Sequence, residues 1–186
     1  QFLNTTKSEE NLKDQLSEMV KQNYIHPCVA FWGYMNEIVQ HGDSPQVHDT
    51  VKRLQKFTNE LDSTRGTYGA MIGDQGYDNE LNTIPNVIGY NLYGGWYGGT
   101  IESNAEAIDN IRSYPQNKPL SLTEYGAEGI LKYHSDNPVN HDYSEEYQLL
   151  FHEKFYDIIV KKDLWGSFVW NMFDFASDSR DEGGMT

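Results

Sequence analysis

The sequence predicts an α/β fold in which about five parallel strands alternate with helices. Short apolar runs of strand length alternate with amphipathic helical patterns, and no linker interrupts them. The loops that follow the strands are long and polar, whereas helix-to-strand connections such as Lys162-Asp163 are short. This asymmetry is typical of an α/β barrel, whose site is built from the strand-to-helix loops.

A complete barrel has eight strands in roughly 250 residues. We therefore expect the 186 residues to form one domain that is part of a barrel, with about three N-terminal strands and a final helix lying outside the chain.

The elements follow from local patterns in chain order. The first helix is expected at 8–22, where Leu12, Leu16, Met19 and Val20 recur at helical spacing. The run CVAFWGYMNE is continuously apolar and aromatic before Asn36-Glu37, as in a strand buried on both faces. By the same reasoning we expect further helices at 44–61, 103–113 and 144–161, and strands at 29–35, 67–72, 87–93, 120–124 and 166–173.

The composition excludes some partners and suggests another. The formal net charge of −14 would repel phosphate backbones and anionic membrane surfaces, so nucleic acid and membranes are not expected partners. Aromatic residues make up 13% of the chain, which suits a protein that stacks on the apolar faces of sugars, although core packing would also use such rings. Cys28 is the single cysteine and cannot form an internal disulfide. We expect a soluble protein, and the sequence leaves open a cytoplasmic, periplasmic or secreted location.

Two glutamates end apolar strands, Glu37 in Asn36-Glu37 and Glu124 in Thr123-Glu124-Tyr125-Gly126. Most glutamates are solvated surface charges, but at a buried strand end the alternative would be a costly unpaired charge. Two carboxylates on neighbouring strand ends are what cleavage of a glycosidic bond requires, since one protonates the leaving oxygen and the other attacks the anomeric carbon. We therefore predict Glu37 and Glu124 as the catalytic pair.

Four motifs follow one another along the chain: HPCVAFWGYMNE, VIGYNLYGGWY, KPLSLTEYG and GSFVWNMFDFAS. Together they resemble glycoside hydrolase family 2, the β-galactosidase and β-glucuronidase family. The resemblance implies barrel strands 4 to 8, with Glu37 as general acid/base and Glu124 as the nucleophile that forms a covalent glycosyl-enzyme. It further implies that Asn36 binds the sugar 2-hydroxyl, that Tyr93 hydrogen-bonds the nucleophile and that Trp170 forms the floor of the sugar subsite.

The segment Gly94 to Gly99 surrounds Trp96 and Tyr97 with glycines. It lacks the GxGxxG spacing and a following Lys-Ser/Thr, so a phosphate-binding loop is not expected. We expect a tight turn in which Trp96 and Tyr97 form a wall of the substrate pocket. The six histidines show no metal-ligand spacing, and we predict no cofactor. Some family members bind magnesium near the acid/base, which leaves His41 and Glu37 as weak candidate ligands.

The substrate predicted from the sequence is a terminal β-galactoside. The stretch at 173–183 resembles the galactosidase-like branch, in which Asp178 and Arg180 would border the sugar. The family also contains β-glucuronidases and β-mannosidases, and both remain alternatives. In the family, the groups that grip a glucuronide carboxylate lie just beyond the end of this chain. An alternative that is not an enzyme is also open: the chain could be a non-catalytic barrel fragment with at most weak sugar binding. Open barrel edges also predict self-association into a homo-oligomer.

Overall fold

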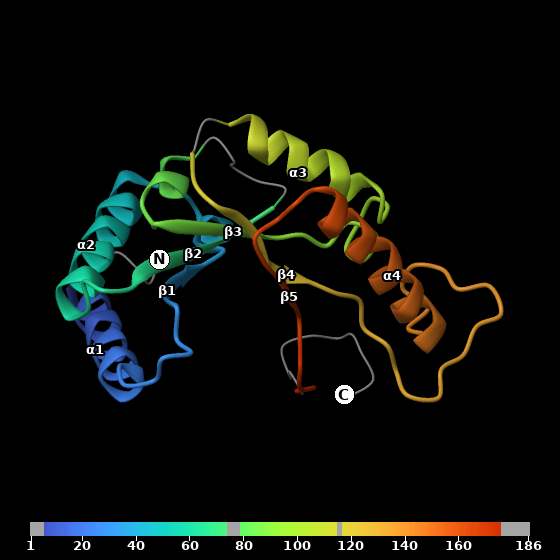
Figure 1. Ribbon diagram of the computed structural model, residues 1–186, viewed down its shortest axis with the longest axis horizontal. Coiled ribbons are helices and arrows are strands. Elements are labelled where there is room, and N and C mark those ends of the chain that lie inside the picture. The colour runs from blue at the N-terminus through green and yellow to red at the C-terminus, as the bar shows by residue number, and fades with distance from the viewer. Residues whose placement is uncertain (1–5, 74–78, 115–116, 176–186) are drawn as a thin grey trace. The chain divides into compact units, whose positions relative to one another are not determined.

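The computed structural model describes residues 6–73, 79–114 and 117–175 (Figure 1). In these residues, five strands form a sheet in the order β1-β2-β3-β4-β5, which is also their order along the chain. The pairings of β1 with β2 and of β4 with β5 are parallel. The predicted fold with five parallel strands and intervening helices is confirmed. No helix in this part of the chain combines the length and the apolar character needed to cross a membrane.

The chain divides into two compact units, and each is described by itself. Unit 1 comprises 1–90 and 114–120, and unit 2 comprises 91–113 and 121–186. The prediction that 1–186 form a single domain stays a prediction.

Unit 1 is built from two helices on two paired strands. The helices α1 (Thr6–Asn23) and α2 (Pro45–Leu61) contact one another, and α2 contacts β1 (Phe31–Asn36) and β2 (Gly66–Ile72) (Figure 1). Helix α2 begins where the Ser44 hydroxyl accepts a hydrogen bond from the Val47 N–H, with a proline at the first helical position. Its apolar stripe is buried, as are Val20 of α1 and Met71 of β2. The unit also contains η2 (Ile38–His41), η3 (Glu80–Thr83) and most of β3 (Val87–Asn91).

A buried carboxylate fixes the passage from α2 to β2. Asp62 ends α2, and its Oδ2 accepts hydrogen bonds from the indole of Trp32 at 2.9 Å and from Arg65 at 2.8 Å. Its Oδ1 accepts from both the backbone and the hydroxyl of Thr64. Burial alone would raise the pKa of Asp62, but these hydrogen bonds hold it well below its usual range. The charged network therefore secures the start of β2 against α2 and β1.

Unit 2 contains the helices α3 (Ser103–Ser113) and α4 (Glu145–Lys161), which contact one another, β5 (Ser167–Val169) and all of β4 (Leu120–Tyr125) except its first residue. The Ser144 hydroxyl caps the start of α4 by accepting from the Tyr147 N–H at 3.0 Å. Ile108 of α3, Leu122 of β4 and Phe155 of α4 are almost fully buried. The core of this unit thus lies between helices and strands, as the alternating pattern predicts.

The observed elements agree closely with the predicted ranges, and the largest difference is in the last strand. The prediction extends it over 166–173, whereas β5 ends at Val169. Val169 is the register partner of Tyr125, the last residue of β4, so the neighbouring strand ends there as well.

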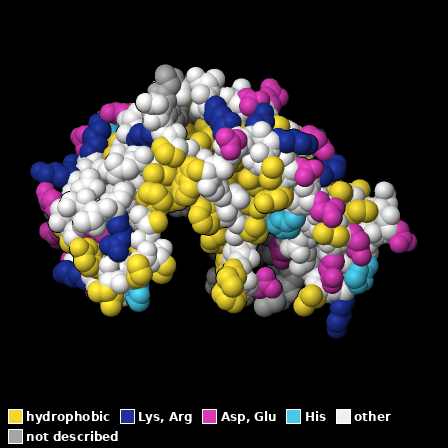
Figure 2. All heavy atoms as spheres, viewed as in Figure 1, with side chains coloured by type: hydrophobic (Ala, Val, Ile, Leu, Met, Phe, Trp, Pro, Cys, Tyr) yellow, Lys and Arg dark blue, Asp and Glu magenta, His cyan; other side chains and the backbone are white. Residues whose placement is uncertain are grey.

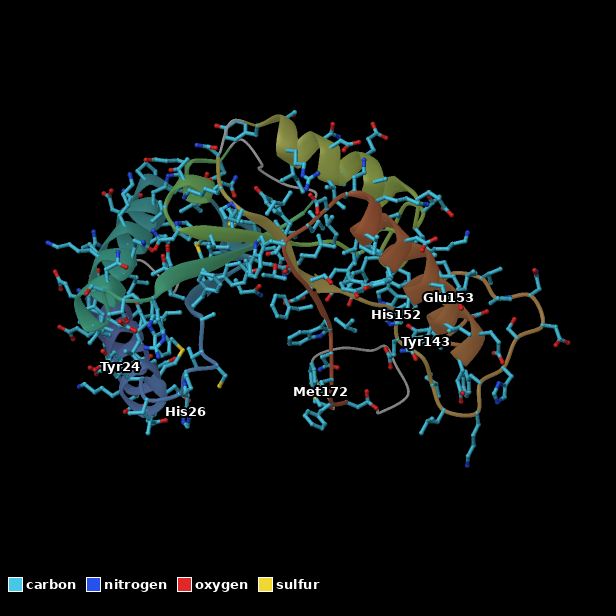
Figure 3. All side chains as sticks on the ribbon, viewed as in Figure 1. Tyr24, His26, Tyr143, His152, Glu153 and Met172 are labelled. Carbon is cyan, nitrogen blue, oxygen red and sulfur yellow. The ribbon has the colours of Figure 1, made fainter. Side chains whose placement is uncertain are left out.

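Apolar side chains are exposed on β5 and on the segment that follows it. Met172, labelled in Figure 3, is 86% exposed, and Phe168, Trp170, Phe173 and Phe175 are at least half exposed. Figure 2 shows apolar side chains open to solvent at the end of the described chain. Because β5 is an edge strand of the sheet, this surface agrees with the expectation of an open edge. Self-association through it stays a prediction.

Candidate active site

Glu124 is held by a tyrosine from the segment after β3. Glu124 is the second-last residue of β4, and the Tyr93 hydroxyl donates a hydrogen bond of 2.8 Å to its Oε2. The backbone brings the two segments together, because the Leu92 N–H donates to the Glu124 carbonyl at 3.0 Å. Both side chains are half-buried. The structure therefore joins two residues predicted for the site, and the phenol fixes the orientation of the carboxylate.

A second side-chain contact ties the same two segments. The Thr123 hydroxyl donates to Oδ1 of Asn91 at 2.5 Å, and Asn91 is 3% exposed. No role for either residue was predicted from the sequence. The signal that could have found them is that Asn91 is the one polar side chain of β3 and that Thr123 directly precedes Glu124. This hydrogen bond flanks Glu124 and supports the strand end on which it lies.

The glycine-rich segment is a tight turn, as predicted. The N–H groups of Trp96 and Tyr97 both donate to the Tyr93 carbonyl, at 2.9 and 3.1 Å. Gly95 has φ 85°, and a Cβ there would lie 2.5 Å from Cγ1 of Ile101, so only glycine fits. The turn starts directly from Tyr93, and its geometry therefore fixes the backbone of the residue that contacts Glu124.

Trp96 lies inside an aromatic cluster and is 4% exposed. Its ring centroid is 4.3 Å from that of His141 and 5.3 Å from that of Tyr143, both with edge-on geometry. Tyr143, labelled in Figure 3, comes from the loop before α4. Tyr147 of α4 donates its hydroxyl hydrogen to the Gly95 carbonyl, and burial raises the pKa of this phenol. Trp96 thus anchors the turn from within, and its role as a wall of the substrate pocket stays a prediction.

Trp170 directly follows β5 and is placed beside the end of β4. Its N–H donates to the Tyr125 carbonyl at 2.9 Å. A Cβ at Gly126 would lie 2.5 Å from the Trp170 carbonyl oxygen, so the glycine permits this approach. The indole is 50% exposed and meets the ring of Phe175 edge-on at 6.0 Å. The backbone therefore places Trp170 beside Tyr125, the residue that follows Glu124, and about half of the Trp170 surface is exposed.

Glu37 directly follows β1 and has left-handed backbone angles, φ 49° and ψ 30°. This conformation is uncommon for a residue other than glycine, asparagine or aspartate, and such outliers cluster at functional sites. The Glu37 N–H donates to the Ala70 carbonyl of β2 at 3.0 Å, and its carbonyl accepts from the Gln40 N–H at 3.0 Å. Hydrogen bonds on both sides of the peptide therefore hold the strained residue in place.

The Glu37 carboxylate is also held from within its own turn. Nε2 of Gln40 donates to Oε2 of Glu37 at 2.8 Å. Gln40 was not predicted for the site, although its spacing of three residues from Glu37 fits one turn of a 3-10 helix. The neighbouring Asn36 is the last residue of β1 and has an exposed side chain. Glu37 and Asn36 belong to unit 1 and Glu124 to unit 2, so their convergence in one pocket stays a prediction.

The described residues offer no obvious metal centre. No group of three or more His, Cys, Asp or Glu suited to hold a metal ion occurs in 6–73, 79–114 and 117–175. Glu37, one of the two weak magnesium candidates, accepts a hydrogen bond from Gln40. Asp178 and Arg180 lie outside the described residues.

The alternating strands and helices, with Glu37 directly after β1 and Glu124 near the end of β4, have the arrangement of part of an α/β barrel. Residues 3–183 match the family described as glycosyl hydrolases family 2, TIM barrel domain. The chain belongs to this family, and the predicted partial barrel is confirmed.

The chain is similar to several proteins named β-glucuronidase. It is 35% identical to a β-glucuronidase of Bacteroides fragilis over 98% of this chain and 26% of that protein. Among solved structures, an FMN-binding β-glucuronidase of Faecalibacterium prausnitzii L2-6 is 40% identical with a TM-score of 0.91, covering 97% of this chain and 28% of that one.

A further solved structure is Bacteroides uniformis β-glucuronidase 2, covalently bound to cyclophellitol-6-carboxylate aziridine. It is 31% identical with a TM-score of 0.88, covering 96% of this chain and 23% of that one. The chain thus spans about a quarter of the length of these relatives.

Proposed function

We propose that this chain carries the catalytic pair of a retaining β-glycosidase that hydrolyses β-glucuronides. The observation that carries the proposal is the hydrogen bond from Tyr93 to Glu124 at a strand end, because a nucleophilic carboxylate must be held in one orientation. The strained backbone of Glu37 at the end of β1 supports the second carboxylate role.

In the proposed reaction, Glu124 attacks the anomeric carbon while Glu37 gives its proton to the leaving oxygen. A covalent glycosyl-enzyme forms, with the glycosidic bond broken and the aglycone released as an alcohol. Glu37, now a carboxylate, then takes a proton from water, which attacks the anomeric carbon and frees Glu124. This double displacement requires carboxyl groups about 5 to 5.5 Å apart. The half-exposed indole of Trp170 is suited to pack against an apolar sugar face, and Asn36 to bind the 2-hydroxyl.

The choice of sugar differs from the one that the sequence predicts. The stretch at 173–183 favours a β-galactoside, whereas the relatives reported above are named β-glucuronidases. One of them is covalently bound to a carboxylate-bearing sugar analogue. These names favour a β-glucuronide, and the β-galactoside remains the second candidate because of the terminal stretch.

The test uses the full-length protein that contains this chain. It is incubated with cyclophellitol-6-carboxylate aziridine and, in parallel, with a galactose-configured aziridine that lacks the carboxylate. We expect the first reagent to add to the protein by intact mass, with the adduct mapped to the peptide that contains Glu124. The Glu124→Gln variant should remain unlabelled and lose at least roughly a thousand-fold in activity.

Several outcomes would count against parts of the proposal. Labelling of Glu124 by the galactose-configured reagent alone would favour the β-galactoside. Labelling at another residue, or full activity in Glu124→Gln, would remove Glu124 from its role. Turnover by the full-length protein but not by 1–186 alone would identify the isolated chain as the non-catalytic fragment.

A further inference from the structure

A cluster of charged side chains closes the turn that carries Glu37. The turn runs from Glu37 through η2 to Asp43, directly before the helix cap Ser44. Asp43 Oδ1 lies 2.5 Å from Nε2 of His48 in the first turns of α2, and Nδ1 of His48 lies 3.0 Å from Oε2 of Glu80 in η3. Three segments of unit 1 therefore meet at one imidazole ring.

The two contacts of His48 favour the charged form of the ring. A neutral imidazole has a single N–H, and an ionised carboxylate only accepts hydrogen bonds. Both ring nitrogens face carboxylates here, so only the imidazolium donates to both. Burial would lower the pKa of His48, but the hydrogen bonds to Glu80 and Asp43 outweigh it and raise the pKa above its ordinary value.

The remaining oxygens of the two carboxylates are engaged as well. Oδ2 of Asp43 accepts from Nδ2 of Asn79 at 2.8 Å, and Oε1 of Glu80 accepts from Lys52 at 2.6 Å. Asn79 also caps η3, because its Oδ1 accepts from the Leu81 N–H. The side chain of His48 is only 15% exposed, whereas those of Asp43, Glu80 and Lys52 are about half exposed. His48 is therefore the sheltered centre of the cluster.

This cluster acts on the same turn that orients the Glu37 carboxylate. The start of the turn is attached to β2 by the hydrogen bond from the Glu37 N–H to Ala70. The carboxylate is attached to the turn itself through Gln40. A shift at the end of the turn, around Gly42 and Asp43, would therefore move Gln40 and with it the carboxylate.

We propose that His48, as an imidazolium bridging Asp43 and Glu80, is a positioning residue for the acid/base Glu37. The proposal rests on the proposed function of Glu37. Removing the contacts from His48 to Asp43 and Glu80 leaves the fold intact but lets the end of the turn move. The step that slows most is then the proton transfer from Glu37 to the leaving group. A displacement of about 1 Å in a catalytic group can lower a rate roughly a hundred-fold, which makes a measurable effect reasonable.

The test compares substrates that differ in their need for a proton. In the full-length protein, kcat/KM is measured for phenyl and 2,4-dinitrophenyl β-glucuronide with His48→Gln, Asp43→Asn and His48→Arg. A phenoxide needs protonation to leave, whereas dinitrophenoxide does not. We expect His48→Gln to lower kcat/KM roughly ten-fold for the phenyl substrate and less than about two-fold for the dinitrophenyl one. Asp43→Asn should show a smaller change of the same kind.

His48→Arg should recover most of the loss, since a guanidinium can donate to both carboxylates. The matched control is His134→Gln in unit 2, where the histidine pairs with Glu146 at 2.9 Å on an exposed surface. It should leave both substrates unaffected. Equal losses for both substrates, or no loss in either His48→Gln or Asp43→Asn, would overturn the positioning role.

The proposed function is tested separately by Glu37→Gln. If this variant keeps activity on the phenyl substrate, Glu37 is not the acid and the role of His48 falls with it. If Glu37→Gln is inactive on the phenyl substrate but His48→Gln matches the unaltered enzyme, only the positioning role fails.

Discussion

The two units of the chain are stabilised by different kinds of interaction. In unit 1, charged groups reach into the protein: the Asp62 side chain has no exposed surface, that of His48 is 15% exposed and that of Glu9 is 16% exposed. In unit 2, the carboxylates of the described ion pairs are at least 42% exposed, and stacked aromatic rings fill the interior instead. The two proposed catalytic glutamates thus belong to units whose stability should respond differently to salt, pH and loss of side-chain volume.

The largest effect is expected from removing a ring in unit 2. Phe155 is fully buried, and its ring stacks on that of Tyr125 at 4.9 Å and lies tilted against that of Phe151 at 5.4 Å. Phe155→Ala should lower the free energy of unfolding by about 3 to 5 kcal/mol, through lost burial and the cavity left behind. Phe155→Leu, which keeps most of the volume, should cost under about 1.5 kcal/mol. Urea denaturation at low and high salt checks both values, and a loss that depends strongly on salt would contradict the aromatic origin.

The next effect is expected from the buried carboxylate of unit 1. Asp62→Asn should cost about 3 kcal/mol, because it leaves the partly buried Arg65 without its charged partner. Trp32→Phe removes a single hydrogen bond to the same carboxylate and should cost nearer 1 kcal/mol.

The pH dependence of this effect follows from the low pKa of Asp62. A carboxylate whose pKa is lower in the folded state contributes stability above its unfolded pKa and loses it as pH falls through the folded pKa. The difference between wild type and Asp62→Asn should therefore be constant from about pH 5 to 8 and shrink only in stronger acid. Urea midpoints across that range measure it, and a difference that shrinks between pH 8 and 5 would contradict the assignment.

The smallest effect is expected from the ion pairs of Glu9 in α1, with Arg53 of α2 and with Lys13 of α1. Glu9 accepts hydrogen bonds from Arg53 at 2.8 to 3.0 Å and pairs with Lys13 at 2.8 Å. The hydrogen bond from Arg53, followed by that from Lys13, lowers the pKa of Glu9 to about 2. Glu9→Gln should cost under about 1 kcal/mol, and this cost should shrink in high salt.

The same pair should also weaken in acid, since the stability from a lowered carboxyl pKa is present above the unfolded value and lost as pH falls toward 2. Thermal denaturation at two salt concentrations, with Glu60→Gln as an exposed control on α2, measures the effect. If salt leaves the cost of Glu9→Gln unchanged, the Glu9 ion pairs behave like the buried network of Asp62 and not like exposed ion pairs that salt screens.

The fold could be predicted from the sequence because its signals are local. Helices α2 and α4 begin at serine caps, and the apolar runs mark the strands. The last strand was predicted too long, because the apolar side chains of Trp170, Met172 and Phe173 continue the pattern beyond Val169, where β5 ends. Hydrophobicity reports where apolar side chains lie in the chain, whereas strand pairing depends on where the neighbouring strand ends.

The part of the site that could be predicted also has local signals in the sequence. The motif residues Tyr93 and Glu124 were assigned by resemblance, and their contact needs only the usual pairing of adjacent strands. Gln40 and His48 were not predicted, because their roles depend on a 3-10 turn and on side chains that meet from three segments. The burial of Trp96 was not predicted, because it results from rings on a loop more than 40 residues away. Such long-range contacts leave no local pattern in the sequence.

The left-handed backbone at Glu37 has a consequence for how this position tolerates mutation. Most L-amino acids there adopt an unfavourable conformation, whereas glycine avoids the steric penalty and asparagine and aspartate tolerate it better than the rest. In a saturation library, glycine at 37 should therefore give the highest yield of folded protein while abolishing turnover. Selection for abundance and selection for activity would then favour different residues at one position.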